Sequence, residues 1–205
     1  MREFSSDVAF TPAVKAIQTA KGSRKLYAKV EERGGWETTV TEELAQFIGE
    51  RDEFYLATAN AEGQPYIQYR GGRPGFLRVI DKHTLGFADF GGNQQYITLG
   101  NLSQNPKAFI FLMDYVDLRR IKLWGRARVI EDDPALVDRL RDVEDPSPAE
   151  RAILFDIDAW DINCQQHIHR RFPQEIVAPF IEKLQARIQE LEVQLDVSGE
   201  GAGSR

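Results

Sequence analysis

The sequence predicts a mainly β fold with flanking helices, built around an antiparallel barrel of six to seven strands. Between residues 54 and 130, apolar residues alternate with a period of two, as in half-buried strands. These segments are short, they are separated by turn residues, and one helix interrupts them, which is typical of a small barrel. On both sides of this region the apolar spacing becomes three to four residues, as in helices. A barrel with helices before and after it is therefore the expected fold.

Residues 1–40 are expected to form an N-terminal helical arm. Thr11 and Pro12 are a typical N-cap and first helical residue, and helical apolar spacing continues until Gly34-Gly35. A further helix is expected after Thr41, because its first turn carries two glutamates where negative charge suits the helix dipole.

Residues 41–172 are expected to form the barrel domain. Strands are predicted at residues 54–59, 66–70, 76–80, 85–90, 108–113, 118–130 and 152–160, and helices at 94–102 and 132–140. The strand at 118–130 alternates most clearly, because Arg120, Lys122, Arg126 and Arg128 share one face and apolar residues the other.

Residues 173–197 are predicted to form a long amphipathic helix. One apolar stripe recurs every three or four residues, at Ile176, Phe180, Leu184, Ile188, Leu191 and Leu195. Two arrangements fit this stripe: the helix packs on its own barrel, or it pairs with a partner subunit. Residues 198–205, with three glycines, are expected to form a disordered tail.

Composition excludes several classes of function. A net charge of −6 argues against nucleic acid or an anionic membrane surface as the main partner. The sequence contains no run of about 18 apolar residues, so no membrane-spanning segment is predicted. The polar, acidic N-terminus is unlike a signal peptide, and the single cysteine suits a reducing compartment. We therefore expect a cytoplasmic protein.

Side-chain catalysis has little support in the sequence. The chain has no nucleophile elbow, zinc motif or Walker motif, and its three histidines have no metal-ligand spacing. Cys164 lies close to His167 and His169, which suggests a Cys–His pair. The alternative is that Cys164 is a small packed residue, the more common role of a lone cysteine.

The segment Leu85–Tyr96 predicts an anion-binding junction. A strand runs into Gly91-Gly92 and then into a helix expected to open with Asn93 and Gln94. Free backbone N–H groups at such a junction bind phosphate. Two roles are open for the basic residues elsewhere in the barrel: they converge on this junction and bind the anion, or they are solvated charges on the barrel surface. These residues are Arg70, Arg73, Arg78, Arg119, Arg120 and Lys122.

Four motifs occur in an order that points to one family. They are Gly63-Gln64-Pro65, Leu85–Gln94, Leu99–Leu102 with Asn105-Pro106, and Arg119–Gly125. In the order and spacing of these motifs, the chain resembles the pyridoxamine 5'-phosphate oxidase-like family of FMN-binding split barrels. Within that family it is most similar to the group called pyridoxamine 5'-phosphate oxidase-related proteins. The resemblance implies a split β-barrel with FMN at the interface of a homodimer.

The resemblance also implies a set of cofactor-binding positions. The strand after the Gly-x-Pro turn lies along the isoalloxazine ring, the strand-to-helix junction receives the phosphate, and a polar residue on the long strand comes from the second subunit. In this sequence the positions are Gln68, Tyr69 and Arg70; Phe87, Ala88, Gly92, Asn93 and Gln94; and Arg120.

The sequence departs from the oxidases of this family at two places. Their Arg-Lys phosphate pair is replaced by the neutral Asn93 and Gln94, so we expect Arg70, Arg78 or Arg120 to supply the positive charge. Their arginine-bearing C-terminal segment is replaced by the long helix, so Gln166, His167 and Arg170 become candidates for a lid on the substrate side. Oxidation of pyridoxamine phosphate itself is therefore not expected.

The leading functional prediction is an FMN-dependent oxidoreductase that acts on an unidentified small molecule. The isoalloxazine then supplies the electron chemistry, so no conventional catalytic constellation is needed. A non-catalytic flavin carrier or redox sensor is one alternative. Another is a split barrel that holds F420 or haem, with His167 and His169 as candidate axial ligands.

Overall fold

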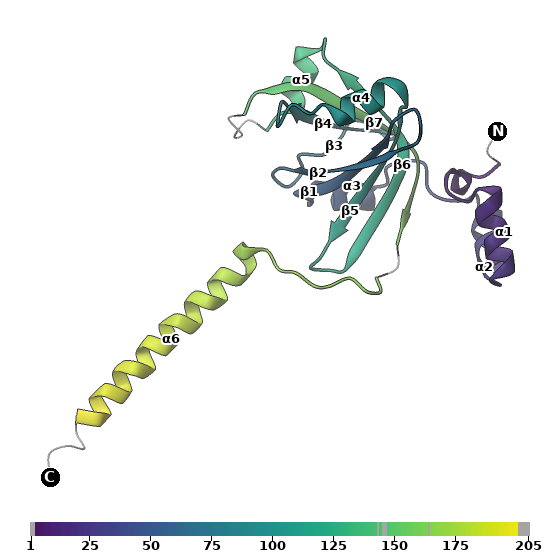
Figure 1. Ribbon diagram of the computed structural model, residues 1–205. Coiled ribbons are helices and arrows are strands. Elements are labelled where there is room, and N and C mark those ends of the chain that lie inside the picture. Colours follow the sequence, from purple (N-terminus) through teal and green to yellow (C-terminus); the bar gives the residue numbers. More distant parts are fainter. Residues whose placement is uncertain (1–2, 143, 145–146, 164, 201–205) are drawn as a thin grey trace. The chain divides into compact units, whose positions relative to one another are not determined.

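The structure of the chain is a computed structural model, which describes residues 3–142, 144, 147–163 and 165–200 (Figure 1). The chain divides into two units. The first holds the residues up to 114 together with 119–166, and the second holds 115–118 together with the residues from 167 onward. The barrel, the arm and the predicted cofactor-binding residues all belong to the first unit.

The N-terminal arm consists of short helices rather than one continuous helix. They are η1 (Ser5–Val8), α1 (Pro12–Ala20) and α2 (Arg24–Glu32). Thr11 caps α1 as predicted, accepting a hydrogen bond from the Val14 amide at 3.3 Å. Gly22 has a φ of +80°, a left-handed conformation that interrupts the helix at low cost for glycine.

The barrel is a single seven-stranded antiparallel sheet, which confirms the predicted mainly β fold. Its strands are β1 (Glu53–Ala59), β2 (Pro65–Gly71), β3 (Arg78–Val79), β4 (Thr84–Phe90), β5 (Lys107–Asp114), β6 (Arg119–Ile130) and β7 (Ala149–Ile162). Their order is β2-β1-β5-β6-β7-β4-β3, so β2 forms one edge and β3, beside β4, forms the other.

The boundaries of β3 and α4 differ from the predicted ones. β3 covers only two of the five expected residues, because the chain turns at Arg73–Phe76, where the Phe76 amide bonds to the Arg73 carbonyl at 3.0 Å. The helix α4 (Ile97–Gln104) begins three residues later than expected, since Gln94 (φ +57°) and Tyr96 (φ +51°) have left-handed backbones that no α-helix accommodates.

The alternating pattern places one side of each strand in a common apolar core. On β1 and β5, for example, Phe54, Leu56, Ile110 and Leu112 are almost completely buried. The helix α3 (Glu42–Gly49) covers this core with Leu44, Phe47 and Ile48, as its spacing predicts. Burial of these side chains is the main stabilising contribution to the barrel.

A smaller apolar cluster lies on the other face of β4 and β7. The helix α5 (Pro134–Leu140), capped by Asp133, packs Val137 and Leu140 there against Leu154. Leu154 is therefore buried although its neighbours Ile153 and Phe155 face the barrel core.

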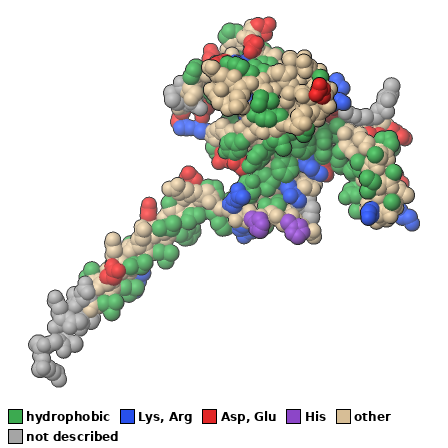
Figure 2. All heavy atoms as spheres, viewed as in Figure 1, with side chains coloured by type: hydrophobic (Ala, Val, Ile, Leu, Met, Phe, Trp, Pro, Cys, Tyr) green, Lys and Arg blue, Asp and Glu red, His purple; other side chains and the backbone are tan. Residues whose placement is uncertain are grey.

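The second unit contains one long helix, α6 (Gln174–Glu200). It extends to Glu200, and residues 201–205 of the predicted tail lie outside the described residues. Figure 2 shows hydrophobic side chains along the part of α6 whose side chains are described. No described helix combines the length and apolar composition that crossing a membrane requires.

Candidate functional site

The edge strand β2 and the strand β4 meet across a seam between the two ends of the curled sheet. Arg70 of β2 donates a hydrogen bond to Asp89 of β4, and deeper in the barrel the rings of Phe54 and Phe87 lie 5.1 Å apart. We call the side chains of Gln68, Arg70, Asp89, Thr98 and Arg151 the seam cluster. The barrel is thus closed here by side chains rather than by backbone hydrogen bonds.

The alternation of β2 determines which of its residues enter the seam. Gln68 and Arg70 pair with Leu56 and Phe54 of β1, whose side chains face the barrel core. Successive side chains of a strand point to opposite faces, so the intervening Tyr69 lies on the outer face, where it is 56% exposed.

A pocket, which we call the seam pocket, opens beside the seam, and five of the predicted cofactor-binding residues line it. These are Gln68, Arg70, Gly92, Asn93 and Gln94. The pocket has a volume of about 140 Å³, and its lining also includes Tyr66, Tyr96 and Arg151. The structure therefore brings the predicted β2 residues and the predicted phosphate-binding turn to one place.

Asp89 organises the charges of the pocket. One of its carboxylate oxygens accepts a hydrogen bond from Arg70, and the other accepts one from Arg151 at 3.2 Å. Asp89 is only 2% exposed and Arg151 only 6%. Two guanidinium groups are thus held side by side through one buried carboxylate.

Arg151 has two further carboxylate partners, Glu131 at 3.2 Å and Glu150. Burial lowers the pKa of Arg151, but its hydrogen bond to Asp89 and the surrounding negative charges outweigh burial, so this pKa lies above its ordinary value. The guanidinium also lies 5.5 Å from the centre of the Tyr96 ring, a cation–π contact. Arg151 therefore stays charged at every physiological pH.

Arg70 combines a fixed position with an unused donor. Its guanidinium lies 5.5 Å from the centre of the buried Phe87 ring, and one of its terminal nitrogens bonds to Asp89. Its Nε is buried and has no hydrogen-bond partner. A buried donor without a partner is costly, so an acceptor that reaches it gains a strong, charge-assisted bond.

The turn between β4 and α4 forms another wall of the pocket. Gly92 has a φ of +52°, and the Gln94 amide bonds to the Gly91 carbonyl at 3.1 Å. The Asn93 side chain accepts a hydrogen bond from the Gln95 amide at 3.2 Å. Asn93 and Gln94 therefore belong to a tight exposed turn that precedes α4, and they do not open the helix as the sequence predicted.

Two side-chain hydrogen bonds fix α4 on the neighbouring strands. Thr98 donates to Gln68 of β2 at 2.7 Å, and Asn101 donates to Thr58 of β1 at 3.0 Å. Thr98, Asn101 and Thr58 are buried, so these bonds hold the turn at a set distance from β2.

The structure does not place the other predicted site residues in this pocket. Tyr69 lies on the outer face of β2, Phe87 is in the core, Arg78 is exposed on β3, and Arg120 lies on β6 with its Nε buried. Gln166 ends the first unit, whereas His167 and Arg170 belong to the second. Their roles at a cofactor or lid site stay predictions.

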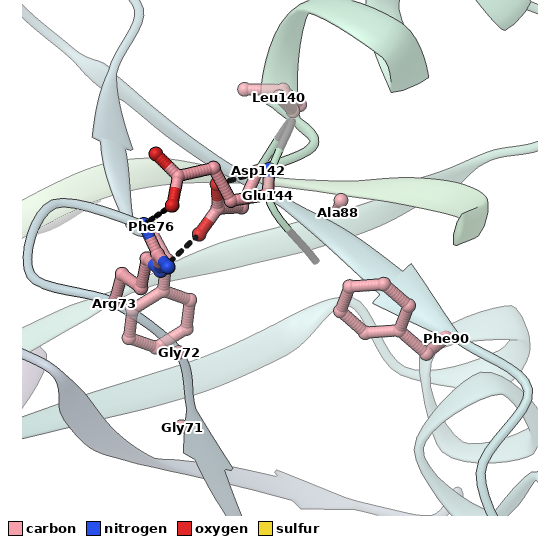
Figure 3. A pocket seen from close by; sticks show the side chains of 9 residues that line it. All are labelled: Gly71, Gly72, Arg73, Phe76, Ala88, Phe90, Leu140, Asp142 and Glu144. Carbon is pink, nitrogen blue, oxygen red and sulfur yellow. Dashed lines mark hydrogen bonds and ion pairs between the residues drawn. The ribbon is translucent and has the colours of Figure 1, made fainter. Parts of the chain in front are cut away.

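Ala88 lines a second pocket, of about 320 Å³, on the α5 side of β4. Its wall includes Phe76 and Phe90, and Arg73 reaches across it to Asp142 at 3.4 Å and to Glu144 (Figure 3). The charge of Arg73 is therefore balanced within this pocket and does not join the seam cluster.

Sequence reasoning missed Asp89 and Arg151. The predicted strand began at residue 152, but β7 begins at Ala149, and Arg151 pairs directly with Asp89 in the β4–β7 register. A usable signal was present: Arg151 has the same parity as Ile153 and Phe155, so it is a cation on the inward face of the strand.

Neither a metal site nor a Cys–His pair is supported. Within the part of the chain that the structure describes, no three His, Cys, Asp or Glu side chains group as metal ligands. Cys164 lies outside the described residues, so the structure tests neither the Cys–His pair nor the packed cysteine.

Comparison with known proteins identifies the family. The sequence profile of the pyridoxamine 5'-phosphate oxidase family matches residues 40–164, more than half of the chain. The chain belongs to the pyridoxamine 5'-phosphate oxidase family. The matched region spans the whole barrel and both walls of the seam pocket. No curated protein matches the chain.

Solved structures of similar fold include the HupZ protein of group A Streptococcus, with 18% identity and a TM-score of 0.50, covering 65% of this chain and 99% of that one. An FMN-binding protein from Syntrophomonas wolfei has 16% identity and a TM-score of 0.46, covering 71% and 97%. General stress protein 26 from Bacillus anthracis has 16% identity and a TM-score of 0.46, covering 59% and 91%. The family match and the antiparallel sheet together confirm the predicted split-barrel fold.

Proposed function

We propose that the seam pocket binds the phosphate of FMN, and that the chain is an FMN-dependent oxidoreductase acting on a small molecule. The observation that carries this proposal is the convergence of Arg70, Arg151 and the Gly91–Tyr96 turn on one pocket. Membership of the pyridoxamine 5'-phosphate oxidase family supports it.

The charges of the pocket fit a phosphate group. Arg151 is already balanced by three carboxylates, those of Asp89, Glu131 and Glu150. Arg70 shares a single carboxylate, that of Asp89, within the described part of the chain, so Arg70 is the cation that we expect to meet the phosphate. Arg70 lines the pocket, where its guanidinium is held by Asp89. We therefore assign Arg70 the role that the Arg-Lys pair has in the oxidases, with Arg151 in support.

The size of the pocket supports a site that is completed by a second subunit. Complete ligand sites usually enclose roughly 300–1,000 Å³, whereas this pocket measures about 140 Å³. It has room for the phosphate end of FMN but not for the flavin ring. The resemblance implies that Arg120 of a second copy contacts the cofactor, so a homodimer is part of the proposal.

When bound, the isoalloxazine of FMN accepts and donates electrons. The residues of this chain hold the phosphate through Arg70, set the distance between β2 and the turn through the Gln68–Thr98 bond, and orient the cofactor. Among the residues that the structure describes, no histidine lines the seam pocket, which favours a phosphorylated flavin over haem.

Titration of the protein with FMN tests the proposal through Asn93→Asp. This substitution places a negative charge in the turn beside the phosphate, and we expect it to weaken FMN binding about tenfold or more. Asn60→Asp is the matched control, since Asn60 also accepts amide hydrogen bonds in a tight turn, at 2.9 and 3.0 Å, but does not line the pocket.

Arg120→Ala tests the contribution of the second subunit in the same titration. If neither Asn93→Asp nor Arg120→Ala weakens FMN binding, the site assignment is wrong. Adding a reduced pyridine nucleotide and then an acceptor separates an enzyme from a carrier. Repeated cycles of flavin reduction and reoxidation are expected for the enzyme, while a bound flavin that stays oxidised identifies the carrier or sensor.

A further inference from the structure

The helix α6 exposes a continuous apolar face. Five large side chains on it are between 41% and 70% exposed: Ile181, Leu184, Ile188, Leu191 and Leu195. Apolar faces of this extent are rare on soluble monomers and mark surfaces that another molecule covers. An occupant for this face is therefore required.

The spacing of the face identifies the kind of occupant. The regular series differs from the predicted stripe at its start, where Val177 and Ile181 replace Ile176 and Phe180. Its residues are separated alternately by four and three positions: Val177, Ile181, Leu184, Ile188, Leu191 and Leu195. This is the heptad repeat of a coiled coil, with Ile181, Ile188 and Leu195 at the a positions and Val177, Leu184 and Leu191 at the d positions. A helix that packs on a globular domain usually presents a wider stripe with less regular spacing.

We propose that α6 pairs with α6 of a second copy of this chain as a parallel two-stranded coiled coil. Isoleucine at a with leucine at d, as at Ile181–Leu184 and Ile188–Leu191, favours two parallel strands over three or four. This inference goes beyond the proposed function and does not depend on whether FMN binds.

Charge complementarity supports a second copy in parallel orientation. In this register Arg187 is at a g position and Glu192 at the following e position. Parallel pairing brings these two opposite charges together across the interface, twice by symmetry. Arg187 also forms an ion pair with Glu190 of its own helix at 2.8 Å. Both side chains are more than half exposed, so this ion pair is weak and does not prevent Arg187 from pairing with Glu192 of the second copy.

Pro179, the one proline inside α6, is compatible with this pairing. It occupies an f position, on the side of the helix opposite to the a and d residues. Its missing amide and its ring therefore disturb the solvent face and leave the apolar seam of the helix continuous.

Cysteine cross-linking of the full chain tests the inference. In a parallel pair, identical d positions face each other at a separation that a disulfide spans, whereas f positions point away. We expect Leu184→Cys to form a covalent dimer under mild oxidation, about tenfold more than Ala186→Cys. Both variants carry Cys164→Ser, which removes the native thiol.

A low, equal yield from both variants overturns the proposal, since it means that α6 is covered by its own barrel, by another protein or by nothing. Equal and high yields indicate random collision and overturn it too. Leu191→Cys provides a second test at another d position, and the proposal requires that this variant also cross-links. FMN titration of the same variants distinguishes this failure from failure of the cofactor site, since the coiled coil and the seam pocket are separate claims.

Discussion

The β1–β2 side of the barrel meets β4 through two contacts of opposite chemistry. Inside the barrel, the buried rings of Phe54 and Phe87 pack edge to face at 5.1 Å. At the seam, Arg70 donates to Asp89, which also binds Arg151. The aromatic contact removes apolar surface from water. The ionic contact gains less, because desolvation of buried charges offsets much of their attraction.

The two contacts have different roles. The aromatic contact stabilises the fold, and we propose that the ionic contact positions Arg70 for an anion in the pocket. They are coupled at one point, because the Arg70 guanidinium lies over the Phe87 ring at 5.5 Å. Each of the following substitutions tests one side of this division.

Phe87→Ala has the largest expected effect. Removal of a fully buried ring leaves a cavity, so the free energy of unfolding should fall by about 3–5 kcal/mol, measured by urea denaturation. Phe180→Ala is the control, since Phe180 is 67% exposed and its loss should cost less than about 0.5 kcal/mol. Comparable losses for the two variants would contradict the assignment of Phe87 to the core.

Asp89→Asn tests the ionic side. It leaves the buried Arg151 and the partly buried Arg70 without their shared carboxylate, so the free energy of unfolding should fall by about 3 kcal/mol. Inorganic phosphate should restore part of this loss, because an anion replaces the missing charge. Thermal melting with and without phosphate measures the recovery. If phosphate raises the melting temperature of the variant no more than that of the natural protein, the proposed anion-binding role of this cluster is contradicted.

Thr98→Val tests how firmly α4 is held against β2. The substitution keeps the shape of Thr98 but removes its 2.7 Å bond to Gln68, at an expected cost of about 1 kcal/mol. Thr19→Val is a matched control, because the exposed Thr19 hydroxyl bonds only to the Lys15 carbonyl of its own helix. Equal unfolding free energies for the two variants would show that the Gln68 bond adds nothing.

Tyr69 gives the smallest effect and probes the outer face of β2. Burial, and then the charge of Glu53, raise the pKa of Tyr69 above its ordinary value of 10.0. The folded state thus favours the neutral phenol. The contribution of Tyr69 to the free energy of unfolding is therefore fully present below pH 10 and is lost as the pH rises through the raised pKa. Tyr69→Phe should flatten stability above pH 10 in alkaline melting curves. An unchanged pH profile would contradict this.

Local patterns predicted the fold well because they reflect burial directly. The alternation on β6 placed Ile121 and Leu123 in the core, and the spacing after Thr41 placed Leu44 and Phe47 there. The short β3 and the late start of α4 were not predictable in this way, because they depend on a turn and on left-handed residues rather than on hydrophobicity.

The candidate site was predictable only in part. Motifs pointed to Gln68, Arg70 and the Asn93 turn, which the structure gathers in one pocket. The pair of Asp89 and Arg151 joins residues 62 positions apart through the β4–β7 register. A single sequence does not reveal which strands pair, so it shows a charge on an inward face but not the partner of that charge.

The central claim is that Arg70 and the seam pocket recognise the phosphate of a flavin. Parallel titration with FMN and riboflavin tests it most directly, since the two differ only in that phosphate. A charge-assisted bond is worth about 1.5–3 kcal/mol, so FMN should bind about tenfold or more tighter than riboflavin. Arg70→Gln should remove this preference and leave riboflavin binding unchanged. Equal affinity of the natural protein for both flavins, or a preference that survives Arg70→Gln in a folded variant, would contradict the account.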